Sequence, residues 1–253
     1  MPVTALLLGV LTACGGEEPA AAPPPPAGQA AGKQGPAKLP EATTYTRVAG
    51  APRDTGTTAA NSVIRVLKKQ VVYDRPDGKP VAMLPITQLG APTWVPVVET
   101  SGEWRRVLLP SRPNGTSGWV RPAEGTVRSA KTPYAVRVEL GARRLRLTNG
   151  RTTVGTWKVA VGTAKHPTPT GRTFLLAVLK PQRGGYSPLI MPLGSHSNTL
   201  ETFGGGPGTV GLHGWPDAKV FGQAVTHGCV RVPSDALRAL AKVPLGSPVL
   251  VTA

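Results

Sequence analysis

Turn dipeptides separate short runs of alternating apolar and polar residues through most of the chain. The clearest case is "RRLRLTNGRTTVGTWKVAVG", in which Asn149 and Gly150 stand between two alternating runs. Asn-Gly is the strongest short-range signal for a two-residue β-hairpin, because both residues tolerate positive φ angles. Asp77 and Gly78 separate two earlier runs in the same way. The sequence therefore predicts many short strands joined by tight turns.

Glycine and proline are too frequent for a mainly helical protein. The 253 residues include 31 Gly and 28 Pro, and both residue types destabilise helix interiors. We therefore expect a mainly β fold with one short helix, in the segment "PSDALRALAKV". Leu237, Leu240 and Ala241 would share one face of that helix. Ser234 or Asp235 would be its N-cap.

A lipoprotein signal is predicted at the N-terminus. Leu6 to Leu11 form an apolar run that is too short to span a bilayer as a helix. The run is followed by "LTAC", and this stretch resembles the lipobox of bacterial lipoproteins. The resemblance implies a signal peptide over residues 1–13 and a lipid on the sulfur of Cys14. An ordinary signal peptide with a chance cysteine is the alternative.

A disordered tether is predicted after the signal. Residues 14–61 are rich in Pro, Ala, Gly and Thr, as in "AAAPPPPAGQAAG", and offer little apolar surface to bury. With a lipid on Cys14, this tether would hold the folded part of the protein off the membrane and inside the cell wall. The expected location is the cell envelope, at the outer face of the cytoplasmic membrane, and the expected membrane contact is the lipid anchor.

A small β-barrel is predicted over residues 62–130. Short apolar runs alternate there with turn signals, among them Ser101-Gly102. The segments "GEWRRVLL" and "GTSGWVRP" resemble the closing strands of bacterial SH3-like domains. This resemblance implies an SH3-like barrel that binds wall peptides. The alternative is a barrel that only spaces its neighbour from the anchor.

Cys229 is the most reactive group that the sequence offers. If Cys14 carries a lipid, Cys229 has no disulfide partner in an exported chain. A thiolate attacks carbonyl carbon, and a neighbouring histidine is the usual group that activates it. His227 lies two residues before Cys229, so an extended strand would place both side chains on one face. His213 ends an apolar run that could return beside the strand of the cysteine.

Other interpretations of these residues exist. Cys229 could be a small buried apolar residue, and His213, His227 and Cys229 could together bind zinc. No second cysteine or evident carboxylate lies near the motif, so no metal site is predicted. His166 and His196 are predicted to be solvated loop residues.

The segments "GLHGW" and "THGCVRV" frame the two histidines and the cysteine. They resemble the active-site signature of the L,D-transpeptidases, whose catalytic module is called the YkuD domain. "HPTPTGRTFLL" and "GSPVLV" also resemble strands of that family. The resemblance covers residues 133–253. It implies a β-rich sandwich with one short helix that follows the barrel.

The resemblance further implies a cysteine acyltransferase of peptidoglycan stem peptides. Cys229 would attack the third residue of a stem tetrapeptide and release D-alanine, and a second stem would then close a 3-3 cross-link. His213 would be the base, with its ring oriented by the carbonyl of Gly214. His227 would line the pocket. The amides of Gly228 and Cys229 would form the oxyanion hole.

Two further residues of the motif are implied to contact the substrate, Thr226 and Arg231. Arg231 would either grip a carboxylate of the stem peptide or brace the site. No metal or organic cofactor is required for this chemistry, and a carbapenem would acylate Cys229.

The charge of the chain predicts an acidic partner. There are 29 Lys and Arg against 13 Asp and Glu, a net charge of +16, which fits an anionic cell wall. The basic residues are scattered singly, so we do not expect nucleic acid as a partner. We expect a monomer. Water as the acceptor would make the protein an L,D-carboxypeptidase, and a degenerate catalytic domain would leave a non-catalytic wall-binding lipoprotein.

Overall fold

Strands form nearly all of the regular structure, as the turn pattern predicts. The computed structural model describes residues 38–181 and 185–253, all within the unit Lys38–Ala253. The predicted signal peptide, Cys14 and the first part of the predicted tether lie outside these residues. None of the helices in the described ranges has the length and apolar character needed to cross a membrane.

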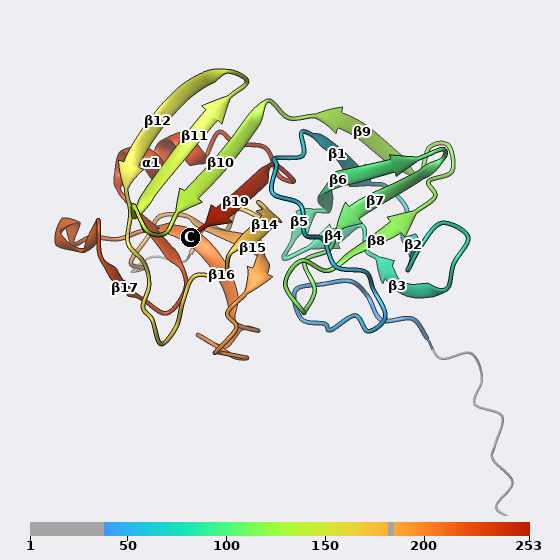
Figure 1. The fold of residues 1–253 in the computed structure, drawn as a ribbon, viewed down its shortest axis with the longest axis horizontal. Helices are drawn as coiled ribbons and strands as arrows, with labels where there is room; N and C mark the ends of the chain where they lie inside the picture. The colour runs from blue at the N-terminus through green and yellow to red at the C-terminus, as the bar shows by residue number, and fades with distance from the viewer. Residues whose placement is uncertain (1–37, 182–184) are drawn as a thin grey trace, which may run out of the picture. The chain divides into compact units, whose positions relative to one another are not determined.

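The N-terminal part of this unit is an antiparallel sheet of seven strands, in the order β3-β2-β8-β7-β6-β1-β9 (Figure 1). Its strands are β1 (Ser62–Val66), β2 (Gln70–Tyr73), β3 (Pro80–Leu84), β6 (Trp94–Ser101), β7 (Trp104–Leu108), β8 (Ser117–Val120) and β9 (Val127–Lys131), with a ribbon of β4 (Thr87–Gln88) and β5 (Ala91–Pro92) between β3 and β6. The turns predicted at Asp77-Gly78 and Ser101-Gly102 are confirmed, because they join β2 to β3 and β6 to β7. The SH3-like barrel stays a prediction, and 'the barrel' below names this N-terminal sheet with its connections.

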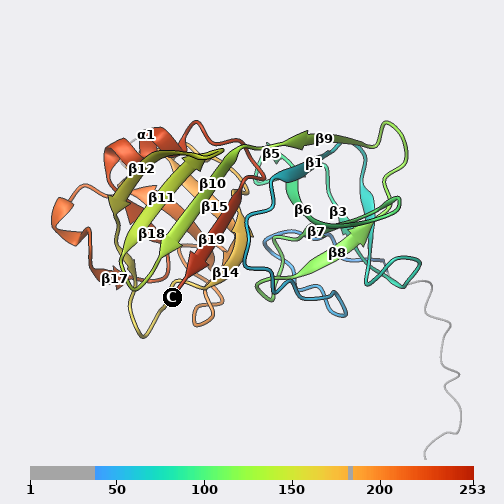
Figure 2. The same cartoon turned by 45° about the horizontal axis from the view of Figure 1, so that its top comes forward.

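The C-terminal part contains a five-stranded sheet, β12-β11-β10-β19-β14, and a three-stranded sheet, β15-β16-β18 (Figure 2). The strands are β10 (Tyr134–Glu139), β11 (Arg144–Asn149), β12 (Thr152–Lys158), β14 (Gly171–Phe174), β15 (Ile190–His196), β16 (Thr209–Gly214), β18 (Val230–Val232) and β19 (Pro248–Thr252). Two short paired strands, β13 (Val161–Gly162) and β17 (Ala224–Thr226), a 3-10 turn η1 (Ala218–Val220) and the helix α1 (Ser234–Leu240) complete it. The predicted Asn149-Gly150 hairpin joins β11 to β12.

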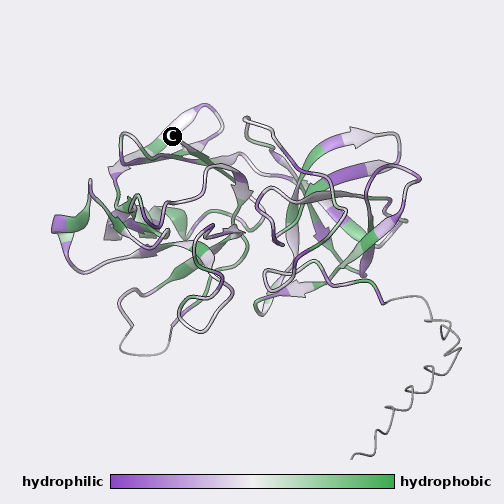
Figure 3. Cartoon of the chain, turned by 60° about the horizontal axis from the view of Figure 1, so that its bottom comes forward, coloured by the Kyte–Doolittle hydropathy of each residue, from purple (hydrophilic) through white to green (hydrophobic). Residues whose placement is uncertain are grey.

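Apolar side chains of both sheets meet in one core. Val136 and Leu145 of the five-stranded sheet lie in the same buried cluster as Leu212 and Val230 of the three-stranded sheet, and Leu237 of α1 joins them. In Figure 3 the hydrophobic stretches, drawn in green, lie mostly along the strands and the helix. Burial of this apolar area is the main stabilising contribution to the sandwich. The prediction of a mainly β sandwich with one short helix is confirmed.

The helix α1 differs from its prediction in two details. Its N-cap is Pro233, and no side chain caps it, so neither Ser234 nor Asp235 has the predicted role. Both lie inside the first turn because the extended backbone of Pro233, at φ −67° and ψ 162°, already leads into the helix. Ala241 is exposed because it follows the last turn, and Ala236 fills the buried face instead.

The prediction of a disordered tether is wrong for residues 38–61. Ala42 and Val48 are buried in the apolar cluster of the barrel. The hydroxyl of Thr44 lies 3.0 Å from Nε2 of His196, which is fully buried and not the solvated loop residue predicted. Composition misled here because a segment with few apolar residues can still be ordered by a neighbouring sheet that completes its backbone hydrogen bonds.

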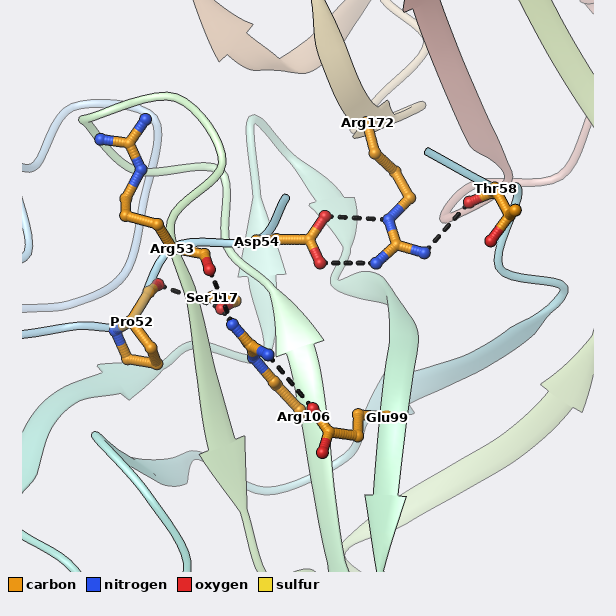
Figure 4. A network of polar contacts seen from close by, with 8 residues as sticks. All are labelled: Pro52, Arg53, Asp54, Thr58, Glu99, Arg106, Ser117 and Arg172. Atoms are coloured by element: carbon orange, nitrogen blue, oxygen red, sulfur yellow. Dashed lines mark hydrogen bonds and ion pairs between the residues drawn. The ribbon is translucent and has the colours of Figure 1, made fainter. Parts of the chain in front are cut away.

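A buried ion pair ties the same segment to the sandwich (Figure 4). Arg172 of β14 donates to both carboxylate oxygens of Asp54, at 2.9 and 2.5 Å, and the two side chains are only 8% and 5% exposed. A third donor of Arg172 reaches the carbonyl oxygen of Thr58 at 3.0 Å. On the barrel side, Arg106 donates to the carbonyl oxygen of Arg53 at 2.8 Å. This segment therefore connects the barrel to the sandwich.

Candidate active site

The pairing of β16 with β18 places the predicted nucleophile and base at neighbouring strands. The two strands run parallel, with Leu212 opposite Val230 and His213 opposite Arg231. Side chains two residues apart along a strand share a face. Cys229, one residue before β18, therefore points to the same face as Arg231 and lies diagonally across from His213. Neighbours of this kind are within reach of each other's side chains.

His213 is held in the orientation that a general base requires. The ring is 5% exposed, and its Nδ1 lies 2.8 Å from the carbonyl oxygen of Gly214. Because a carbonyl can only accept, Nδ1 carries the proton and Nε2 is left as the acceptor. Gly214 is fixed in turn, since its amide donates to the hydroxyl of Ser187 at 2.8 Å. The predicted role of the Gly214 carbonyl thus has a geometric basis, and Ser187 is a support that the sequence did not reveal.

The electrostatics of the pair favour two neutral groups at rest. Burial raises the pKa of the Cys229 thiol, and this effect outweighs the lowering by a backbone hydrogen bond with Gly211 and by the charge of Arg231. Burial likewise lowers the pKa of His213, against the opposing effect of its bond to Gly214. A thiol and a neutral imidazole are suited to proton transfer during attack, rather than to a preformed thiolate–imidazolium pair.

Two aromatic side chains that sequence reasoning missed enclose His213. The rings of Tyr186 and His213 make an edge contact with centroids 4.9 Å apart, and Trp215 lies 5.4 Å from Tyr186. The guanidinium carbon of Arg231 is 3.5 Å from the centroid of Trp215, a cation–π contact. Trp215 is adjacent to the motif in "GLHGW" and could have been found there. Tyr186 carries no comparable signal, because its loop is distant in sequence.

A groove of about 1020 Å³ begins next to this aromatic group. Its lining includes Gly214 and Trp215, which follow His213, and Leu237 of α1. Cationic residues of the lining are Lys180, Arg238 and Lys242. The groove therefore offers an apolar surface with basic groups beside the face that carries His213.

His227 belongs to a different group of rings from His213, and its predicted role in lining the pocket stays a prediction. Its ring is exposed and lies 5.2 Å from the ring of His166 and 5.4 Å from that of Phe203, whereas His213 belongs to the other aromatic group. The alternation argument fails because the backbone bends between β17 and β18, with φ of +115° at Gly228. Across the described ranges, clusters of three or more His, Cys, Asp or Glu with metal-binding geometry are absent.

Thr226 supports the turn, which corrects the prediction of a substrate contact. Its side chain is 2% exposed, accepts a hydrogen bond from the amide of Gly228 at 3.1 Å and donates to the carbonyl oxygen of Cys229 at 2.6 Å. The amide of Gly228 is thereby occupied by a side chain. The other predicted oxyanion donor, the amide of Cys229, takes no part in these two hydrogen bonds.

Comparison with known proteins agrees with this geometry. The family model described as the L,D-transpeptidase catalytic domain, YkuD, matches residues 133–251. A curated protein of Bacillus licheniformis, named "Putative L,D-transpeptidase YkuD", is 30% identical over 154 residues, which cover 58% of this chain and 86% of the relative. This chain belongs to the L,D-transpeptidase family. Enzymes of this family act on peptidoglycan stem peptides.

Further relatives share lower identity with this L,D-transpeptidase. A protein of the same name from Bacillus subtilis is 28% identical over 120 residues, which cover 47% of this chain and 66% of the relative. Among solved structures, an L,D-transpeptidase from Mycobacterium smegmatis has 17% identity and a TM-score of 0.43, and the match covers 82% of this chain and 99% of the other. One from Mycobacterium tuberculosis has 18% identity and a TM-score of 0.40, with 56% and 74% covered.

Proposed function

We propose that this L,D-transpeptidase is a cysteine acyltransferase that forms 3-3 cross-links through a thioester on Cys229. The observation that carries the proposal is the parallel pairing of β16 with β18, which supports a catalytic pair on one face of the sheet. The tautomer of His213 supports the same assignment, because its unprotonated nitrogen is free to accept the thiol proton.

In the first step the sulfur of Cys229 bonds to the carbonyl carbon of the third residue in the donor tetrapeptide. The thiol proton passes to Nε2 of His213 as this bond forms. The amide of Cys229 donates to the oxyanion that develops. The C–N bond to the terminal D-alanine then breaks, and His213 returns the proton to the leaving amine. The products are a thioester on Cys229 and free D-alanine.

In the second step the side-chain amine of another stem peptide attacks the thioester carbonyl. His213 takes a proton from this amine and passes it to the sulfur of Cys229 as the C–S bond breaks, so the thiol leaves in its neutral form. Arg231 binds a carboxylate of a stem peptide in this proposal. Two observations support it: ion pairs within the described ranges do not include Arg231, and its Nε is buried there without a partner.

We also propose the cellular setting that the N-terminal sequence supports. The protein is exported and anchored by a lipid on Cys14 to the outer face of the cytoplasmic membrane. The barrel either binds wall peptides or spaces the catalytic sandwich from the membrane, and the net charge of +16 fits an anionic wall. The protein acts as a monomer without metal or organic cofactor.

Incubation with a disaccharide tetrapeptide tests the reaction. Chromatography and mass spectrometry should detect free D-alanine and a dimer linked through the third residues of both stems. The Cys229→Ser variant should form neither, while it keeps the circular dichroism spectrum of the wild type. Tripeptide monomer as the only product would assign water as the acceptor and make the protein an L,D-carboxypeptidase. No D-alanine release by folded wild-type protein would favour the non-catalytic alternative.

A further inference from the structure

Phe203 lies at the edge of the candidate active site, on the segment that connects β15 to β16. This segment, residues 197–208, is called the 197–208 loop below. The ring of Phe203 is 53% exposed and stands beside His227, two residues before Cys229. The same loop holds His166, whose Nδ1 lies 2.9 Å from the hydroxyl of Thr199. The position of the loop therefore determines how the rings around His227 are arranged.

The 197–208 loop is rich in glycine, and its internal backbone hydrogen bonds join Ser197 to Gly208 and Phe203 to Gly206. It contains four glycines, and three of them, Gly204, Gly205 and Gly208, have φ between +58° and +78°. Glycine adopts these angles without a steric penalty, but it loses more conformational entropy than other residues when it becomes ordered. A loop of this composition needs contacts from outside to hold one conformation.

Arg112 supplies these contacts from the barrel. It lies in the connection between β7 and β8, and its guanidinium donates to three carbonyl oxygens of the loop. The acceptors are Ser197 at 3.1 Å, Leu200 at 3.2 Å and Pro207 at 2.9 Å. One planar group with several donors in fixed directions thus links both ends of the loop to its middle.

Other contacts between the two parts of the molecule reach fewer points of the loop. Asn114 accepts from the amide of His196 and donates to its carbonyl oxygen, both at 2.7 Å, so it fixes the end of β15. Its side chain also donates to Oδ1 of Asn198 in the loop at 3.0 Å. Arg47 reaches Glu201 of the loop at 3.6 Å, but these side chains are 61% and 85% exposed. Exposed pairs of this kind contribute little to stability. Arg112 is therefore the side chain that joins three points of the loop to the barrel.

We propose that Arg112 is a positioning residue for substrate binding, which acts by holding the 197–208 loop so that Phe203 and His227 form one wall of the donor-peptide site. The inference rests on the proposed function. His213 and Cys229 are positioned by β16 and β18 and not by the loop. Loss of Arg112 therefore weakens peptide binding, because the loop must be ordered by the substrate, and leaves the chemical step unchanged.

Steady-state release of D-alanine from a stem tetrapeptide tests this role in the full chain. Arg112→Ala should raise KM about 10–100-fold, the range expected for loss of several hydrogen bonds to a charged group, with kcat within about threefold of the wild type. Phe203→Ala should raise KM in the same direction without lowering Tm. Arg112→Lys should lie between wild type and Arg112→Ala, because an ammonium group lacks the planar fork. The matched control, Arg47→Ala, should keep the wild-type KM.

The possible outcomes separate the two proposals. If wild type releases D-alanine but both Arg112→Ala and Phe203→Ala keep its KM, Arg112 has no positioning role and the proposed function stands. A fall in kcat at unchanged KM would likewise overturn the inference, since it would place the effect on the chemistry. If wild type releases no D-alanine, the proposed function fails and the positioning role fails with it. Should Arg112→Ala not fold, Arg112→Lys and Phe203→Ala provide the same readout.

Discussion

At the scale of single residues, the two histidines of the motif have different environments. His213 is buried, its tautomer is fixed by Gly214, and it faces the side of the sheet that carries Cys229. His227 is exposed and contacts other rings. Both stand in the sequence as His-Gly, and only the family resemblance assigns them different roles. The structure adds the difference in burial and contacts, with a bend at Gly228 just after His227.

Substitution of each histidine should therefore have unequal effects. His213→Ala should reduce the rate of Cys229 acylation by about 10²–10⁴-fold, the usual contribution of a general base. His227→Ala should reduce it by less than about tenfold, since a group that only lines a binding surface contributes less. Stopped reactions followed by intact-protein mass spectrometry would measure both rates. Equal losses, or a larger loss for His227→Ala, would contradict the assignment of the base.

The neutral resting pair has a consequence for pH dependence. Because burial raises the pKa of Cys229, its thiolate should accumulate only above the ordinary cysteine range, which lies near pH 8.5. Because burial lowers the pKa of His213, the base should remain unprotonated below the ordinary histidine value of about 6.5. Alkylation by iodoacetamide without substrate should thus rise steeply only in the alkaline range. A plateau between about pH 6 and 8 would indicate a preformed ion pair instead.

At the scale of elements, the contacts between the pre-barrel segment, the barrel and β14 are the least expected feature. Hairpins, the helix and the alternation of the strands follow from local rules, and they agree with the structure. Asp54 and Arg172 are far apart in sequence and give no local signal of their pairing. The same is true of Thr44 and His196, whose mutual burial orders a segment that composition assigns to disorder.

Removal of one partner of the buried ion pair should strongly destabilise the protein, because the other charge is left buried and unpaired. Asp54→Ala leaves the guanidinium of Arg172 buried without its carboxylate and should lower the free energy of unfolding by about 3–5 kcal/mol. The double variant Asp54→Ala/Arg172→Met should recover part of this loss, because it removes the unpaired charge. Urea unfolding would measure both. As a control, Glu99→Ala removes an exposed partner of Arg106 and should change stability by less than about 1 kcal/mol.

His196 should make the same contact dependent on pH. Burial, together with the nearby charge of Arg112, lowers its pKa to about 4, against about 6.5 in the unfolded chain. The unfolded state binds the proton first, so this contribution to stability is complete above about pH 6.5 and is lost as the pH falls toward 4. The difference in unfolding free energy between pH 7 and 4.5 should be about 2–3 kcal/mol smaller in His196→Gln than in wild type. Equal pH dependence in both proteins would contradict the buried neutral ring.

At the scale of the whole molecule, the candidate site residues that sequence analysis could propose are those that stand in a local pattern. Cys229, His213 and the Gly214 carbonyl belong to short segments that strand pairing brings together. Tyr186 and Arg112 could not be found in this way, because Tyr186 contacts His213, and Arg112 the 197–208 loop, from segments distant in sequence. The aromatic and guanidinium contacts that they make depend on the packing of separate elements.

The most direct test of the account is the mass of the protein after incubation with a carbapenem or a stem tetrapeptide. Wild type should gain one acyl group, and peptide mapping should locate it on Cys229. The Cys229→Ala variant should gain none under the same conditions. No adduct on folded, reduced wild-type protein, or an equal adduct on the variant, would contradict the claim that Cys229 is the nucleophile of this L,D-transpeptidase.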